Sequence, residues 1–158
     1  MILIVMGVVG SGKTTIGQLL ARELGFEFAD ADAFHSGENI DKISRGIALS
    51  DADRQPWLGA LRQQILAWAD ARTNAVLACS SLKNSYREEL KAAPCVRFVY
   101  LKGNADLIAG RLSARHGHFA SESILASQLA DLEEPANAVT VDISGSPQEI
   151  VTEIRRRL

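Results

Sequence analysis

Residues Gly7–Thr14 read Gly-Val-Val-Gly-Ser-Gly-Lys-Thr, which has the spacing of a phosphate-binding loop, G-x-x-x-x-G-K-[ST]. An apolar run at 1–6 precedes the motif and a segment with helical spacing at 16–24 follows it, which gives the strand–loop–helix context that such a loop needs. Glycines let consecutive backbone N–H groups turn toward phosphate oxygens, and the helix N-terminus adds partial positive charge. The motif predicts that the protein binds a nucleoside triphosphate.

Each part of this loop has an expected role. Lys13 would reach the β- and γ-phosphates as a catalytic residue, and the Thr14 hydroxyl would ligate Mg²⁺. The alternative is a glycine-rich strand-to-helix turn with an exposed lysine. The predicted nucleotide-binding residues here are Gly7, Val8, Val9, Gly10, Ser11, Gly12, Lys13, Thr14 and Thr15.

Two carboxylates stand at the end of the second predicted strand, at 26–30. Asp30 and Asp32 are two residues apart, so on an extended segment both leave the carboxyl end of that strand on one face. Ligands of open α/β sheets bind at this edge. Phosphoryl transfer to an alcohol would place Asp30 near Mg²⁺, through a water molecule, and Asp32 at the acceptor hydroxyl as a catalytic residue. The alternative for Asp32 is to cap a helix that starts near Ala33.

Polar side chains then recur at helical spacing. His35, Asn39 and Lys42 fall at i, i+4 and i+7 on one helix face. A tautomeric ring, an amide and a cation suit a polyhydroxylated anion as acceptor, although a solvated helix face would have the same pattern. Arg54 is a bidentate donor that helix capping does not need, so we include it in the substrate-binding set. Trp57 is assigned to the core.

A second group of cations follows the third predicted strand, at the same sheet edge. Lys83 and Arg87 are four residues apart on the next helix, where two like charges repel each other. An anion between them would remove that repulsion. We therefore add both residues to the substrate-binding set.

Two further arginines precede a break in the helical pattern. Arg111 and Arg115 are four residues apart, and the sequence His-Gly-His-Phe at 116–119 interrupts the helix after them. Arginines beside a glycine-containing segment suit a lid, at about 111–122, that closes over the triphosphate and stabilises transferred charge. We expect Arg111 to bind nucleotide and Arg115 to be catalytic, and the choice of the main transition-state arginine stays open.

Composition narrows the class of protein. The chain has 158 residues, of which 47% are hydrophobic and 23% charged, as in a single globular domain with a sizeable core. A net charge of −2 offers no basic surface to nucleic acid. Cys79 and Cys95 form neither a C-x-x-C pair nor a disulfide framework, which favours the reducing cytoplasm. The first apolar run is too short to span a membrane, so we expect neither a membrane nor a nucleic-acid partner.

Strand-like and helical segments alternate along the chain. This alternation predicts an α/β fold with a parallel sheet, right-handed crossovers and helices on both faces. The apolar runs at 75–79 and 96–101 are typical of strands buried on both sides. Strands are expected at 2–6, 26–30, 75–79, 96–101 and 139–143, and helices at 15–24, 57–71, 107–112, 123–132 and 147–158.

Taken in order, these motifs resemble the gluconate kinases (gluconokinases) from end to end. The joint set is specific, although several of its parts are weak alone. It comprises the phosphate loop, Asp30-Ala31-Asp32 with His35, Asn39 and Lys42, the run 49–58 (Leu-Ser-Asp-Ala-Asp-Arg-Gln-Pro-Trp-Leu), the run 79–83 (Cys-Ser-Ser-Leu-Lys) with Tyr86 and Arg87, Gly117-His118-Phe119, Ser127-Gln128 and Leu132-Glu133.

The resemblance implies a P-loop kinase fold over 1–158, with a five-stranded parallel sheet in order 2-3-1-4-5, flanking helices and a small lid. The acceptor-binding segment would cover about 32–57. The implied reaction is ATP-dependent phosphorylation of the 6-hydroxyl of D-gluconate, giving 6-phospho-D-gluconate for the pentose phosphate pathway. ATP and Mg²⁺ are the implied cofactors, and a homodimer is common in the family.

Three other readings compete with this one. A nucleoside monophosphate kinase is disfavoured, because the chain is short and the acceptor chemistry of such a kinase would not call for the Asp-x-Asp. Shikimate kinase shares the loop and the Asp-x-Asp, but its glycine triplet after the third strand is replaced here by 79–83. A nucleotide-dependent switch or ATPase would lack an acceptor, and the chain has no Asn-Lys-x-Asp motif of a GTPase. Ile43, Ala48 and Ser81 depart from the gluconokinase pattern without removing a donor, an acceptor or a charge. The loop at 46–49 could still shape selectivity among sugar acids.

Overall fold

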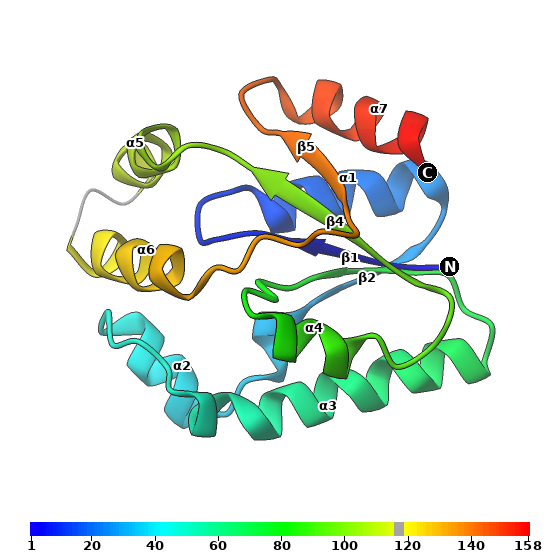
Figure 1. Cartoon of the computed structure of the whole chain (residues 1–158), viewed down its shortest axis with the longest axis horizontal. Coiled ribbons are helices and arrows are strands. Elements are labelled where there is room, and N and C mark those ends of the chain that lie inside the picture. The colour runs from blue at the N-terminus through cyan, green and yellow to red at the C-terminus, as the bar shows by residue number, and fades with distance from the viewer. Residues whose placement is uncertain (116–118) are drawn as a thin grey trace.

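The central feature of the computed structural model, which describes residues 1–115 and 119–158, is a five-stranded parallel sheet (Figure 1). The strand order is β2-β3-β1-β4-β5, which confirms the order that the resemblance implied. In the register of the central strands, Val5 lies opposite Ala78 on one side and Val99 on the other. The strands are β1 (Ile2–Met6), β2 (Glu27–Asp30), β3 (Ala75–Ala78), β4 (Val96–Lys102) and β5 (Val139–Asp142).

Helices form a layer on each face of the sheet and a third group beyond its end. One face carries α1 (Lys13–Leu24) and α7 (Pro147–Arg157), and the other carries α3 (Asp51–Asp70) and α4 (Asn84–Leu90) (Figure 1). Beyond the carboxyl ends of the strands lie α2 (Gly37–Ser44), α5 (Ala105–Arg115) and α6 (Phe119–Asp131). A 3₁₀ helix, Ala31–Phe34, joins β2 to α2. In the described part of the chain, no helix has the length and apolar character needed to cross a bilayer.

Strand β1 separates two hydrophobic cores. All five of its residues are fully buried. Because side chains alternate along a strand, Leu3 and Val5 pack into the core with α1 and α7, whereas Ile2, Ile4 and Met6 pack into the core with α3. The strand is thus fixed from both sides, and so is the point where the chain leaves it.

Helix α3 begins six residues earlier than its hydrophobic pattern predicted. A capping box starts it at Asp51, because Ser50 Oγ accepts from the Asp53 N–H at 3.1 Å and Asp53 Oδ2 accepts from the Ser50 N–H at 2.9 Å. Its first turns are polar, so hydrophobic periodicity gave no sign of them. The early start brings Arg54 onto the helix itself.

Two helical glycines, Gly17 and Gly59, provide a matched test of how tightly α1 packs against the sheet. Gly17 of α1 faces β2, where an added Cβ would lie 2.8 Å from Phe28 Cε2, while a Cβ on Gly59 of α3 would meet nothing within 4 Å. Both alanine variants gain the same helix propensity, about 0.5–1 kcal/mol, but only Gly17→Ala overpacks the sheet contact. We expect Gly17→Ala to be less stable than Gly59→Ala by about 1–3 kcal/mol in urea unfolding. Equal stabilities would mean that the Phe28 ring moves aside without cost.

Candidate active site

The phosphate loop connects β1 to α1 at the carboxyl edge of the sheet. Gly10 and Gly12 have φ of 80° and 95°, in the left-handed region that favours glycine. Gly12 is also the residue that precedes α1. A Cβ on Gly10 would lie 2.7 Å from Leu112 Cγ of α5, so the loop is packed tightly beneath that helix. The loop therefore has the backbone conformation and the helix N-terminus that bind phosphate groups.

Lys13 is held at the mouth of this loop. Its Nζ donates a hydrogen bond to the Val8 carbonyl oxygen at 3.0 Å. Burial lowers the pKa of Lys13, and the carboxylates of Asp32 and Asp30 oppose that shift. An anionic phosphate group at the loop would favour the charged ammonium still further.

Thr14 and Asp30 lie side by side next to the loop. Thr14 Oγ1 donates to Asp30 Oδ2 at 2.6 Å. A hydroxyl and a carboxylate are oxygen ligands of the kind that Mg²⁺ takes together with phosphates and water. The described residues contain no cluster of three or more His, Cys, Asp or Glu side chains that could hold a metal alone. The pair fits an Mg²⁺ ion that arrives with the nucleotide.

The structure corrects the capping alternative for Asp32. Asp30 caps the 3₁₀ helix, because its Oδ1 accepts from the Asp32 N–H at 2.9 Å. Asp32 instead lines a polar cavity, which Lys13 also lines. Burial raises the pKa of Asp32, Asp30 raises it further, and Lys13 opposes the shift. An aspartate of raised pKa beside the phosphate loop is suited to accept a proton from a hydroxyl.

This polar cavity has a volume of about 120 Å³ and lies between the phosphate loop, α2, α3 and α6. Its lining is mixed, with charged and polar side chains as well as apolar ones, several of which come from the segment 43–49. The polar lining consists of Lys13, Asp32, His35, Arg54, Ser80, Ser127 and Gln128, and the apolar lining consists of Val9, Ile43, Ile47, Ala48, Leu49, Trp57 and Ile124.

His35 and Trp57 form a stacked pair at the cavity. Their ring centroids are 4.4 Å apart with an interplanar angle of 11°. Trp57 Nε1 donates to the Ala31 carbonyl oxygen at 2.7 Å, so the buried indole, predicted as core only, also positions the imidazole. Burial lowers the pKa of His35, which favours a neutral ring that can both donate to and accept from hydroxyl groups.

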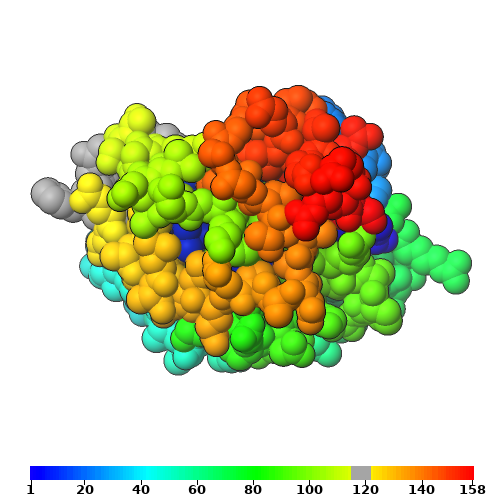
Figure 2. Space-filling view, turned by 45° about the horizontal axis from the view of Figure 1, so that its top comes forward, coloured from blue at the N-terminus to red at the C-terminus, as the bar shows by residue number. Residues whose placement is uncertain are grey.

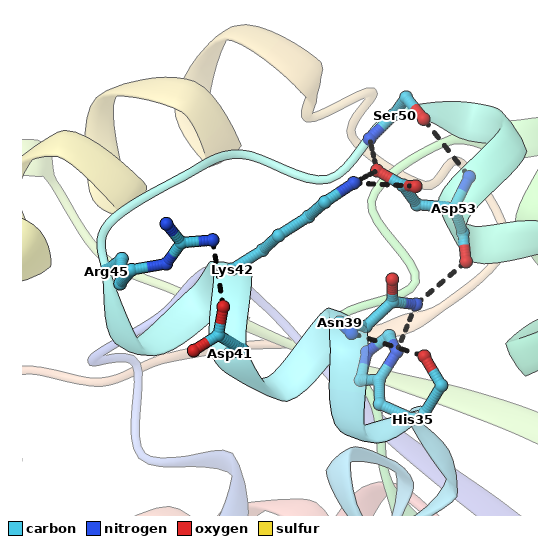
Figure 3. A network of polar contacts seen from close by, with 8 residues as sticks. His35, Asn39, Asp41, Lys42, Arg45, Ser50 and Asp53 are labelled. Atoms are coloured by element: carbon cyan, nitrogen blue, oxygen red, sulfur yellow. Dashed lines mark hydrogen bonds and ion pairs between the residues drawn. The ribbon is translucent and has the colours of Figure 1, made fainter.

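The predicted stripe of His35, Asn39 and Lys42 on one helix is wrong, because α2 begins at Gly37 after a Ser36 cap. Figure 3 shows Asn39 and Lys42 directed toward the start of α3. Asn39 Nδ2 donates to the Asp53 carbonyl oxygen at 2.8 Å, and Lys42 Nζ lies 3.0 Å from Asp53 Oδ1. The two residues join α2 to α3 and do not line the polar cavity, so the structure does not support their substrate-binding role.

Of the other predicted cations, Arg54 does reach the cavity. It is 8% exposed, and its Nη1 donates to the Tyr86 hydroxyl at 2.9 Å and to Asp131 Oδ2 at 3.3 Å. Lys83 does not line the polar cavity. It immediately precedes α4, and its Nζ lies 2.9 Å from Asp51 Oδ1. Arg54 is thus the guanidinium at the cavity and Lys83 a surface ion pair.

Arg87 has a structural role that the sequence did not indicate. Its buried guanidinium donates to the carbonyl oxygens of Ser81, Leu82 and Glu133, at 2.6, 3.0 and 2.7 Å. These bonds fasten the β3–α4 connection to the segment that follows α6. Both Lys83 and Arg87 thus have partners within the protein, and an anionic acceptor between them stays a prediction.

A second depression lies on the other side of the phosphate loop, with a volume of about 420 Å³. Loop glycines, Thr15 and Arg111 line it together with Gly145 and Pro147 from the β5–α7 connection. Arg111 Nη2 donates to the Ile143 carbonyl oxygen at 2.6 Å. The space-filling view shows the dark blue N-terminal segment at the floor of a hollow beside α5 and α6 (Figure 2). The position of Thr15 and Arg111 in the lining of the second depression is compatible with nucleotide binding by both residues.

The predicted lid is described only in part. The side chain of Arg115, the last residue of α5, and residues 116–118 lie outside the described residues.

Helix α6 supplies residues to which sequence reasoning gave no role. Ile124, Ser127 and Gln128 line the polar cavity. Their spacing of i, i+3 and i+4 is the signal that could have found them as one helix face. Gln128 Oε1 also accepts from the Val9 N–H of the phosphate loop at 2.7 Å.

A phosphate loop between β1 and α1, an adjoining Thr–Asp pair and a polar cavity beside its lysine define a P-loop small-molecule kinase. Residues 9–158 match the family model of shikimate kinase. The gluconokinase of Gluconobacter oxydans (strain 621H) is 42% identical over 158 residues, covering 98% of this chain and 89% of that protein. The thermoresistant gluconokinase of Escherichia coli (strain K12) is 41% identical over 157 residues, covering 95% and 89%.

A solved structure agrees with these relatives. A gluconokinase from Sinorhizobium meliloti 1021 superposes with a TM-score of 0.86 at 42% identity, covering 96% of this chain and 87% of that one. The chain belongs to the gluconokinase family, within the wider group of P-loop kinases that the shikimate kinase model describes.

Variants of the two buried arginines, Arg54 and Arg87, should differ in which property they lose, stability or acceptor binding. Arg87→Met leaves three carbonyl oxygens without their donor, so we expect the free energy of unfolding to fall by about 3 kcal/mol while the acceptor KM stays within about twofold. Arg54→Met removes the guanidinium of the cavity and should raise the acceptor KM at least about fivefold. Both constants are to be measured at a temperature where each variant is fully folded. An Arg87→Met enzyme with the KM of Arg54→Met would restore Arg87 to the acceptor site.

Proposed function

We propose that this enzyme transfers the γ-phosphoryl group of ATP to the 6-hydroxyl of D-gluconate, giving 6-phospho-D-gluconate and ADP. The observation that carries the proposal is that Lys13 of the phosphate loop also lines the polar cavity, together with Asp32 and Arg54. One cavity thus offers a base for a hydroxyl and a cation for a carboxylate. The family relatives named gluconokinase are consistent with such an acceptor.

In this reaction the chain mainly positions groups and stabilises charge, because the transition state of phosphoryl transfer is loose. The loop N–H groups and Lys13 bind the phosphates, with Arg111 and Arg115 proposed as further partners of the triphosphate. Thr14 and Asp30 would hold Mg²⁺, which neutralises phosphate charge when bound. Asp32 accepts the proton of the attacking hydroxyl, and its raised pKa makes it a stronger base than an aspartate of ordinary pKa.

The remaining cavity residues recognise the sugar acid. The neutral imidazole of His35, held against Trp57, bonds to hydroxyl groups. Arg54 binds the carboxylate. We further propose a cytoplasmic homodimer, since the family resemblance implies a dimer and the chain has only two cysteines, Cys79 and Cys95.

ADP release, coupled to an optical signal, tests the reaction across gluconate, other aldonates, shikimate and nucleoside monophosphates. Gluconate should give the highest kcat/KM, and ADP release without an acceptor should be close to background. Lys13→Ala should lower kcat at least about a hundredfold with the fold intact, which shows that the activity belongs to this chain. Rapid ADP release without any acceptor would instead indicate an ATPase or a switch, and a preference for shikimate would replace gluconate as the substrate.

Asp32→Asn tests the proposed base. The variant keeps the size of the side chain but loses its charge and basicity, so kcat should fall about 10²- to 10⁴-fold with the KM for ATP little changed. The melting temperature should stay near that of the parent, because Asp30 and not Asp32 caps the 3₁₀ helix. In the parent enzyme, kcat/KM should fall as the pH drops through the raised pKa of Asp32, above the range of an ordinary aspartate. Normal turnover in Asp32→Asn would defeat the assignment.

A further inference from the structure

Gln128 connects two parts of the site that are far apart in the sequence. It stands 119 residues after Val9, and its Oε1 accepts the Val9 N–H at 2.7 Å. A backbone N–H can only donate, so the amide oxygen has to face the phosphate loop and the NH₂ group has to face away from it. Among the described residues the Nε2 atom has no hydrogen-bond partner, while Gln128 itself lines the polar cavity.

Helix α6 is anchored on both sides of this glutamine. Asp131, nearly one turn further on, accepts from Arg54 Nη1 at 3.3 Å, and Arg87 holds the Glu133 carbonyl oxygen just after the helix. Toward the N-terminus, Ser123 Oγ donates to the Gly46 carbonyl oxygen at 3.3 Å. These contacts fix the half-buried Gln128 side chain between the loop and the cavity.

We propose that Gln128 is a substrate-positioning residue, whose amide oxygen holds the Val9 N–H while its NH₂ group donates to an oxygen of the bound sugar acid. The inference deepens the proposed function and rests on it. Through Gln128 the acceptor is positioned against the phosphate loop itself, so that the hydroxyl and the γ-phosphate are aligned by one side chain.

The chemistry of the position calls for an amide. Only an amide of this length accepts from the loop on one side and donates into the cavity on the other. A carboxylate would still accept from Val9, but it would present a negative charge to an anionic acceptor. A thioether would fill the space and do neither.

The competing role for Gln128 is that of a clamp that only holds α6 in place. Gln128→Glu separates the two roles, because it keeps the bond to Val9 and removes the donor. A mere clamp predicts that the added charge raises the KM for gluconate and the KM for ATP alike, because both ligands are anions and Gln128 contacts the phosphate loop as well as the cavity. A positioning residue predicts a gluconate KM raised at least about tenfold, with the ATP KM within about twofold and an unchanged melting temperature.

Two further variants complete the experiment. Gln128→Met should lose the hydrogen bond, seen as an upfield shift of the Val9 amide proton in a ¹⁵N-labelled chain, whereas Gln128→Glu should keep that resonance close to the parent position. Gln63→Glu, an exposed glutamine on α3, makes the same change of charge away from the site and should be kinetically silent.

Each outcome decides the matter. A parent-like gluconate KM in Gln128→Glu overturns the proposal, as does an equal rise in both KM values or a Val9 resonance that does not move in Gln128→Met. If the parent enzyme fails to phosphorylate gluconate, the proposed function falls separately. The Val9 resonance then still tests the bond, and the KM comparison is made with whichever acceptor of the panel the enzyme uses.

Discussion

The phosphate loop can turn its backbone N–H groups inward only because Gly10 and Gly12 take positive φ, and the position of this turn depends on β1. β1 is buried on both faces, so it fixes where the loop begins. Helix α1 fixes where the loop ends, and Leu112 of α5 packs against Gly10. A loop defined in this way can bind phosphate without first being ordered, which leaves binding energy for the reaction itself.

Burial of charge at this loop has a second consequence. The fold removes part of the hydration of Lys13 and Asp32, although Asp32 remains exposed to solvent. This desolvation lowers the pKa of the lysine and raises that of the aspartate. Each group favours the charged form of the other, so the pair partly offsets its own desolvation. In the proposed reaction, triphosphate would provide Lys13 with a stronger partner and leave Asp32 to interact with the acceptor. Groups that are already oriented before the reaction stabilise its transition state without further reorganisation.

The sequence predicted the parts of the site that local chemistry determines. The loop, the strands and the two carboxylates of Asp30 and Asp32 follow from motif and periodicity, while the strand order came from the family resemblance. The partners of the cations were not predictable, because spacing does not reveal which anion the fold brings near. Lys42 meets Asp53 and Arg87 meets backbone carbonyl oxygens. Gln128 was named only as part of the family pattern, and its contact was not predictable for the same reason, since its partner Val9 is distant in the chain.

Lys42, Lys83 and Arg87 have partners within the protein. The polar cavity is lined by the carboxylate of Asp32 and by the cations Lys13 and Arg54. Burial has the largest effect on the pKa of His35 and lowers it, while the negative charge of Asp32 raises it and the positive charge of Arg54 lowers it. Once Lys13 is bound to phosphate, an acidic acceptor is repelled by Asp32 and attracted by Arg54. In gluconate the carboxylate and the 6-hydroxyl are at opposite ends of the carbon chain. In the proposed pose the carboxylate binds Arg54 and the far hydroxyl lies at Asp32 and the phosphate loop, which would account for phosphorylation at the 6-position.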